Sequence, residues 1–132
     1  MDLHKLTIPE AVKGLQSGQF TSVELTKDCL EQIKQTDGDY HAFITVDEKL
    51  ALAQAKTADE LIKSGEAKPL TGIPCSAKDV LATKDMKTTA CSKMLEQYTP
   101  PYNATAIQKI YDDGGVIVGK NNCDEFAHGA ST

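Results

Sequence analysis

The sequence predicts an α/β fold in which N-terminal helices precede the start of a mixed or parallel sheet that helices cover. Two capping boxes and one long amphipathic segment predict a helical region over residues 1–65. Two short apolar runs, at 72–80 and 116–120, flank one further helical segment. This order of strand, helix and strand is typical of a crossover unit with parallel strands. We therefore expect one domain, with a βαβ unit and loop over 72–132.

Two capping boxes predict the first two helices. The run Thr7-Ile-Pro-Glu10 combines a threonine cap, a glutamate three positions later and a proline in the first turn. A helix should begin there and end at Gly18. The run Thr21-Ser-Val-Glu24 is the second box, and we expect its helix to stop within QTDGD, at 35–39. The inward face of this second helix should contain Leu25, Cys29, Leu30 and Ile33.

A third helix is predicted over 48–64, after a short β-prone run at 40–46. Gly65 follows it as a left-handed cap. The expected inner face consists of Leu50, Ala51, Ala55, Ala58, Leu61 and Ile62. The remaining face carries Lys49, Lys56, Asp59 and Lys63, and we expect it to be a solvated surface without a function.

The second half alternates extended runs, loops and one helix. Residues 72–80 should be extended, and 88–101 should be a loop with one helical turn. Asn103 should cap a helix with Ala106, Ile107 and Ile110 inward, ended by Gly114 and Gly115. The run VIVGK at 116–120 predicts a buried strand, followed by loop and a short helical turn. No further strand follows in the sequence, so the predicted sheet looks incomplete.

Composition excludes several classes of function. The 132 residues carry a formal charge of −5, which does not favour general binding of nucleic acids. All 14 basic residues are lysines, so this sequence offers no guanidinium to clamp an anion. The four cysteines are scattered, without metal-ligand spacing to each other or to the histidines, which argues against a zinc site. Free thiols, no signal-like opening and no apolar run of membrane-spanning length predict a cytoplasmic protein.

Lys78 raises the functional question, because it interrupts an otherwise apolar run and Asp79 follows it directly. One interpretation is that its side chain reaches solvent or pairs with Asp79. The other is that the amine is buried and neutral, and acts as a general base for a serine nucleophile. Lowering a lysine pKa from about 10.4 to near 7 costs roughly 4.5 kcal/mol, and full burial supplies shifts of that size.

Three stretches resemble a known family. The run GIPCSAKDV, which we call the lysine segment (72–80), is similar to the G-[IV]-P-x-x-x-K-D pattern of the amidase signature family. TTACSKML, the SKML segment (88–95), and GKNNCDEFAHGAST, the DEFA segment (119–132), are closer to the A subunits of glutamyl-tRNA(Gln)/aspartyl-tRNA(Asn) amidotransferases. The resemblance covers essentially the whole chain, which would be the N-terminal part of a single amidase domain with an incomplete amidase signature fold.

The resemblance implies a Ser–cis-Ser–Lys mechanism. Lys78 corresponds to the lysine that receives a proton from a bridging serine, which in turn deprotonates the serine that attacks the amide of glutamine. Both family serines lie in a Gly/Ser-rich run that this sequence lacks, so we expect the chain alone to be inactive. Ammonia would pass to partner B and C subunits, one of which would use ATP and magnesium to amidate the misacylated tRNA. The chain itself would bind no cofactor.

The resemblance also implies that Gly129, Ala130 and Ser131 help to form the amide pocket. Ser76, two residues before Lys78, leaves a direct Ser–Lys pair conceivable. Three further expectations concern neighbouring residues, with no catalytic or metal role for any of them: Asp124 and Glu125 cap a short helix, Cys91 and Cys123 are small fillers, and His128 lies in a loop. The alternatives are a stand-alone amidase of the same superfamily or an inactive truncated product.

Overall fold

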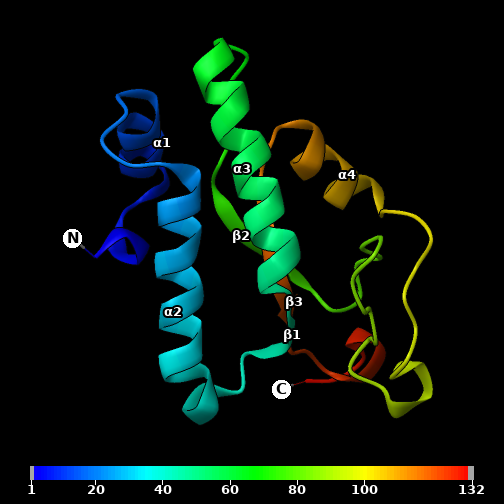
Figure 1. Cartoon of the computed structure of the whole chain (residues 1–132). Helices are drawn as coiled ribbons and strands as arrows, with labels where there is room; N and C mark the ends of the chain where they lie inside the picture. The colour runs from blue at the N-terminus through cyan, green and yellow to red at the C-terminus, as the bar shows by residue number, and fades with distance from the viewer. Residues whose placement is uncertain (1, 131–132) are drawn as a thin grey trace.

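A computed structural model of the chain describes residues 2–130 (Figure 1). Its α-helices are α1 (Ile8–Gln16), α2 (Ser22–Tyr40), α3 (Glu48–Ser64) and α4 (Thr105–Asp112). Its strands are β1 (Phe43–Val46), β2 (Pro74–Lys78) and β3 (Val116–Asn121). Single 3-10 turns cover Leu3–Lys5, Lys93–Leu95 and Glu125–Ala127. The predicted α/β class is therefore confirmed, and each predicted element is present.

Both predicted capping boxes form, but α2 is longer than expected. Thr7 and Thr21 each make the reciprocal pair of contacts with the glutamate three positions later. The prediction that α2 ends within QTDGD is wrong, because the helix continues to Tyr40. A glycine inside a helix costs only about 1 kcal/mol, so Gly38 does not stop it. The helix ends instead at His41, which adopts a left-handed conformation with φ 51°.

Helix α3 has the predicted bounds and the predicted Gly65 cap. Ala51, Ala55 and Ala58 are buried along its inner face. The expectation that Asp59 belongs to a solvated face is wrong. Its carboxylate accepts hydrogen bonds from the backbone N–H groups of Ser22 (2.6 Å) and Val23 (3.2 Å), at the first turn of α2. Asp59 thus caps the N-terminus of a neighbouring helix, which sequence periodicity cannot reveal.

The three strands form a mixed sheet in the order β1-β3-β2. Strands β2 and β3 are parallel, as the crossover unit predicts, and β1 is antiparallel to β3. Helices pack on both faces (Figure 1). Val116 and Val118 of β3 pack with residues of α2 and α3, while Ile117 packs with Ile107 of α4 on the other face.

Helix α4 forms where expected, but Asn103 does not cap it. Ala104 occupies the N-cap position, where no side-chain cap bond forms. The Asn103 side chain instead accepts a hydrogen bond from the backbone N–H of Lys84 (2.8 Å) and donates one to Gln108 (2.9 Å). Of the three residues predicted to face inward, Ile107 is fully buried, Ile110 is half-buried and Ala106 is exposed. Among residues 2–130, no helix combines the length and apolar character that a membrane crossing requires.

Replacing Asp59 tests the tertiary cap of α2. We expect Asp59→Ala to lower the free energy of unfolding by about 1–2 kcal/mol, because two N–H groups at the start of α2 lose their acceptor. Urea denaturation measures this change. Glu60→Ala is the matched control, since Glu60 is the exposed neighbour on the same helix, and it should change the free energy by less than about 0.5 kcal/mol. Equal effects of the two substitutions would contradict the role assigned to Asp59.

Candidate functional site

Lys78 is the last residue of β2, and its side chain is exposed. Its neighbours Ala77 and Asp79 are buried, with 3% and 0% of their surface exposed. Successive residues of a strand face opposite sides, so this alternation turns Lys78 away from the core. Within the described residues the Lys78 amine is therefore open to solvent, and its role as a buried base stays a prediction. Lys78 also forms no ion pair with Asp79 there, because Asp79 pairs with another lysine.

The buried lysine of this site is Lys120, at 0% exposure in the middle of the core. Its Nζ donates hydrogen bonds to the carbonyl oxygen of Leu81 (2.7 Å) and to Oγ1 of Thr88 (2.8 Å). A third contact, 3.7 Å to Oδ1 of Asp79, is an ion pair rather than a hydrogen bond. Burial lowers the pKa of Lys120 below its ordinary value, and the charge of Asp79 opposes this shift. Two hydrogen bonds and one ion pair thus hold the ammonium.

A register shift places Lys120 in the core. Ile117 lies opposite Cys75, but Lys120 lies opposite Ala77, so β3 has one residue more than β2 over this stretch. Without the extra residue, Ile117 and Lys120 would face opposite sides of the sheet. With it, both side chains lie on the face of α4. Gly119 belongs to the same stretch, where a Cβ would lie 2.4 Å from the backbone oxygen of Thr45.

Asp79 binds backbone N–H groups of the SKML segment. Its Oδ2 accepts hydrogen bonds from the N–H of Thr89 (3.1 Å), from Oγ1 of Thr89 (2.5 Å) and, at 3.5 Å, from the N–H of Cys91. Its Oδ1 has no hydrogen-bond partner and faces Lys120. Asp79 therefore joins the lysine segment to backbone N–H groups of the SKML segment.

The three segments that carry the family resemblance meet around Asp79, although up to about 50 residues separate them in the sequence. The backbone N–H of Asp79 donates to the carbonyl oxygen of Asn121 (3.1 Å), which joins the lysine segment to the DEFA segment. Ala90 of the SKML segment donates to the carbonyl oxygen of Asp79 (2.9 Å). Phe126 of the DEFA segment then donates to Ala90 (2.9 Å). One continuous cluster therefore contains all three motifs.

The predicted substrate-binding residues lie at the exposed end of the DEFA segment. Gly129 and Ala130 are exposed, and Ser131 lies outside the described residues. Gly129 packs directly on Asp124, whose carboxylate would lie 2.6–2.9 Å from an added Cβ. Asp124 occupies an N-cap position but its side chain makes no cap bond. Glu125 accepts a hydrogen bond from the Ser92 hydroxyl (2.6 Å), so the prediction that these two acids cap a short helix is wrong.

The structure also gives the exposure and contacts of the other candidate residues from the sequence. Ser76 is exposed, like Lys78, as expected for residues two apart in one strand. His128 is exposed in the loop that follows the last 3-10 turn. Cys123 is buried and Cys91 is half-buried, and the two sulfur atoms lie 3.4 Å apart. The sequence interpretation missed this contact, because no spacing rule links cysteines 32 positions apart. Within residues 2–130, no cluster of three metal-ligating side chains is present.

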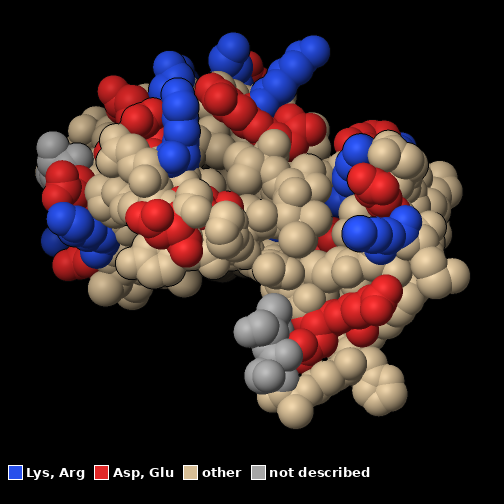
Figure 2. Space-filling model, turned by 90° about the horizontal axis from the view of Figure 1, so that it is seen from below, with Lys and Arg blue, Asp and Glu red and all other residues tan. Residues whose placement is uncertain are grey.

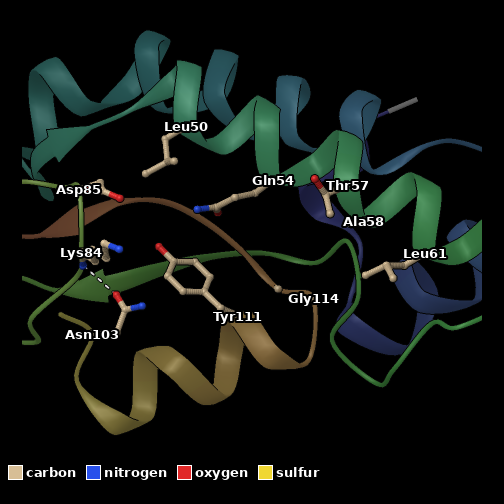
Figure 3. Close-up of a pocket in the computed structure, with 11 residues that line it drawn as sticks. Leu50, Gln54, Thr57, Ala58, Leu61, Lys84, Asp85, Asn103, Tyr111 and Gly114 are labelled. Carbon is tan, nitrogen blue, oxygen red and sulfur yellow. Dashed lines mark hydrogen bonds between the residues drawn. The ribbon is translucent and has the colours of Figure 1, made fainter. Parts of the chain in front are cut away.

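The molecular surface around these elements is uneven. Seen from below the orientation of Figure 1, the outline is notched between the bulk of the molecule and a smaller projecting part (Figure 2). Lysine and acidic side chains are intermixed on this face, which gives it no continuous basic patch. A separate cavity of about 280 Å³ lies between α3 and α4 (Figure 3). Gln54 and Tyr111 line it, whereas Lys78 and Gly129 do not, so we assign it no part in the candidate site.

Comparison with known proteins agrees with the motifs. Residues 24–132 match the Amidase family. A curated relative from Caldanaerobacter subterraneus subsp. tengcongensis, the A subunit of glutamyl-tRNA(Gln) amidotransferase, is 48% identical over 132 residues. The protein of the same name from Dehalococcoides mccartyi is 50% identical over 131 residues. The matches cover 100% and 99% of this chain but 27% of each relative, so the chain spans about a quarter of their length.

Solved structures show the same fold. Native peptide amidase from Stenotrophomonas maltophilia superposes with a TM-score of 0.87 at 28% identity, over 92% of this chain and 26% of that one. A protein from the vestigial complex linked to the origin of an s-triazine catabolic enzyme superposes with a TM-score of 0.87, also at 28% identity. That match covers 92% of this chain and 27% of the other.

The buried pair predicts a specific double-mutant result. Lys120→Met should lower the free energy of unfolding by about 3–5 kcal/mol, because it leaves the Asp79 carboxylate buried without a counter-charge. Lys120→Met combined with Asp79→Asn should recover part of this loss, since no uncompensated charge remains. Urea denaturation of the two variants measures both values. Lys78→Met is the control and should change stability by less than about 0.5 kcal/mol, because Lys78 is exposed. A double variant less stable than Lys120→Met alone would contradict the ion-pair interpretation.

Proposed function

The chain belongs to the amidase family, and we propose that it forms the N-terminal portion of a glutamine-hydrolysing A subunit of a glutamyl-tRNA(Gln) amidotransferase. The observation that carries the proposal is the single cluster formed by the lysine, SKML and DEFA segments around Asp79. Two of these segments resemble the A subunits more closely than general amidases. The relatives that share about half of their aligned residues with this chain bear that subunit name.

The proposed reaction releases ammonia from the side-chain amide of glutamine. Ammonia passes to the B and C subunits of a heterotrimer, where Glu-tRNA(Gln), Asp-tRNA(Asn) or both are amidated with ATP and magnesium in the cytoplasm. The partner subunits make the main contacts to tRNA and nucleotide. The absence of arginine and the net negative charge support this division, because an anion-binding surface needs basic side chains.

In this proposal Lys78 is the general base, and the serine nucleophile and the bridging serine come from sequence beyond residue 132. Because Lys78 is exposed in the described residues, the proposed role requires that its side chain become buried in the complete enzyme. Other parts of the enzyme must cover it, because desolvation is what lowers a lysine pKa toward neutrality. Its position supports the role, since Lys78 ends β2 with an exposed side chain that other segments can reach. Neutral amines in covered sites accept protons from serine.

Gly129, Ala130 and Ser131 are proposed to line the amide pocket. Backbone N–H and C=O groups in such a loop can orient a carboxamide, and Gly129 brings the chain close to the Asp124 carboxylate. The competing function is a stand-alone amidase that hydrolyses small amides, supported by the similarity in fold to peptide amidase. Co-purification with B and C subunits supports the amidotransferase, whereas a monomer that cleaves simple amides supports the alternative.

The chain by itself provides the first functional prediction. Purified residues 1–132 should release no ammonia from glutamine, because no serine of this sequence lies in the family's Gly/Ser-rich run. A coupled glutamate dehydrogenase assay measures ammonia. Turnover that disappears in both Lys78→Ala and Ser76→Ala would overturn the proposal and identify a direct Ser–Lys pair, because these two side chains share one side of β2.

The second functional prediction concerns Lys78 in a completed enzyme. We would join residues 1–132 to the sequence that completes the Caldanaerobacter relative, and co-express the product with the B and C subunits of that organism. Lys78→Ala should lower glutamine hydrolysis by about 10²–10⁴-fold, the usual contribution of a positioned general base. Lys84→Ala is the control, because Lys84 is also exposed but lies in the loop after β2, and it should retain activity. Retained hydrolysis in Lys78→Ala would refute the assigned base.

A further inference from the structure

Two of the four cysteines are in direct contact. The thiol of Cys123 donates to Sγ of Cys91 across 3.4 Å, and the backbone N–H of Cys123 donates to the same sulfur across 3.2 Å. Both cysteines are free. Cys75 donates its thiol instead to a backbone oxygen, that of Ile73 (3.3 Å). Among the described residues, the contacts therefore single out one pair of neighbouring thiols.

We propose that Cys91 and Cys123 are a modification site, at which a peroxide oxidises the two thiols to a reversible disulfide. The Cys91 thiolate attacks one oxygen of the peroxide, which breaks the O–O bond and gives a Cys91 sulfenic acid and hydroxide. The Cys123 sulfur then attacks the sulfenic sulfur, and the S–S bond forms as hydroxide leaves. The thiol protons end on the two hydroxides, so two thiols and one hydrogen peroxide yield one disulfide and two waters.

Access assigns the order of the two steps. Cys91 is half-buried and lines a cavity of about 340 Å³ with Thr45, Thr89 and Ser92, so a small oxidant can reach its sulfur. Cys123 is only 6% exposed. Cys91 is therefore the sulfur that attacks the peroxide, and Cys123 resolves the sulfenic acid from the protein side. A sulfenic acid with a thiol beside it condenses in preference to further oxidation.

The electrostatics of the pair determine how fast it reacts. Burial and the nearby Asp79 carboxylate raise the pKa of Cys91 to about 11, although the hydrogen bond from the Cys123 backbone N–H acts in the opposite direction. The Lys120 ammonium lies in the same cluster, but it already donates to Leu81 and Thr88 and pairs with Asp79. Few Cys91 side chains are thiolates at neutral pH, so the pair stays reduced unless the oxidant persists.

The bond would act on the surroundings of Asp79. Cys91 belongs to the loop whose N–H groups bind the Asp79 carboxylate, and Cys123 closely follows β3. Ala90 and Cys91 both have positive φ, at 50° and 53°, a conformation that costs free energy in residues other than glycine. A covalent link fixes this loop to the segment after β3. The inference is independent of the proposed function, because it concerns chemistry of the chain alone.

Peptide mapping tests the proposal on the unmodified chain. We would treat residues 1–132 with hydrogen peroxide, block free thiols and digest with trypsin. The expected product is peptide 88–93 linked to peptide 121–132, with the loss of two hydrogen atoms and full reversal by a reductant. While the pH is below the pKa of Cys91, the rate of linkage should rise about tenfold for each unit by which the pH is raised. The reason is that the thiolate is the nucleophile.

Two sets of variants complete the experiment. The double variant Cys29→Ser/Cys75→Ser should form the same linked peptide at the same rate, since neither residue belongs to the pair. Cys123→Ser should form no linked peptide and should leave a Cys91 sulfenic acid that dimedone traps. Peroxide treatment of the parent chain that gives only intermolecular dimers, over-oxidised thiols or links to Cys29 or Cys75 would overturn the proposal.

Discussion

The buried ion pair of Lys120 and Asp79 is the constraint on which the loop-rich half of the molecule depends. Both side chains are 0% exposed, and removing a charge from water costs several kcal/mol even in a relaxed protein. That cost is offset only if each charge has well-placed partners. Lys120 accordingly takes Leu81 and Thr88 as acceptors, and Asp79 takes Thr89 as donor. These partners hold the loop after β2 against β3.

The sheet places Lys78 and Lys120 in different environments, although both are lysines at or near the end of a strand. Lys78 is exposed at the end of β2. The extra residue in β3 turns the side chain of Lys120 into the core, opposite Ala77. A shift of one residue exchanges the faces of a strand, so this local irregularity decides which amine is desolvated. Among the described residues the lysine whose burial costs free energy is Lys120. Two hydrogen bonds and the ion pair with Asp79 hold its ammonium in place, which suits a structural cation.

Local signals in the sequence predicted the regular elements well. Reciprocal contacts within Thr7–Glu10 and Thr21–Glu24 involve residues three apart, and the Gly65 cap follows from backbone conformation alone. The errors have a different origin. Asp59 caps a helix 36 residues away, and Asn103 binds Lys84 instead of its own helix. In both cases a partner distant in sequence competes with the local one, and no periodicity or spacing rule records that competition.

The same distinction explains what the family motif conveys. In the lysine segment, the adjacent residues Lys78 and Asp79 have different environments. Strand alternation directs Lys78 to solvent and Asp79 to the core. Within the described residues, Asp79 is fully buried, has donors to Oδ2 and has the Lys120 ammonium as its counter-charge. The environment of Lys78 is open, and its chemistry depends on whatever covers it. A match to such a motif therefore supports the architecture around the aspartate directly, whereas it supports proton transfer by the lysine only through the segments that complete the site. The cluster of three segments is direct evidence for the architecture around Asp79, and it leaves the proton transfer by Lys78 as a proposal.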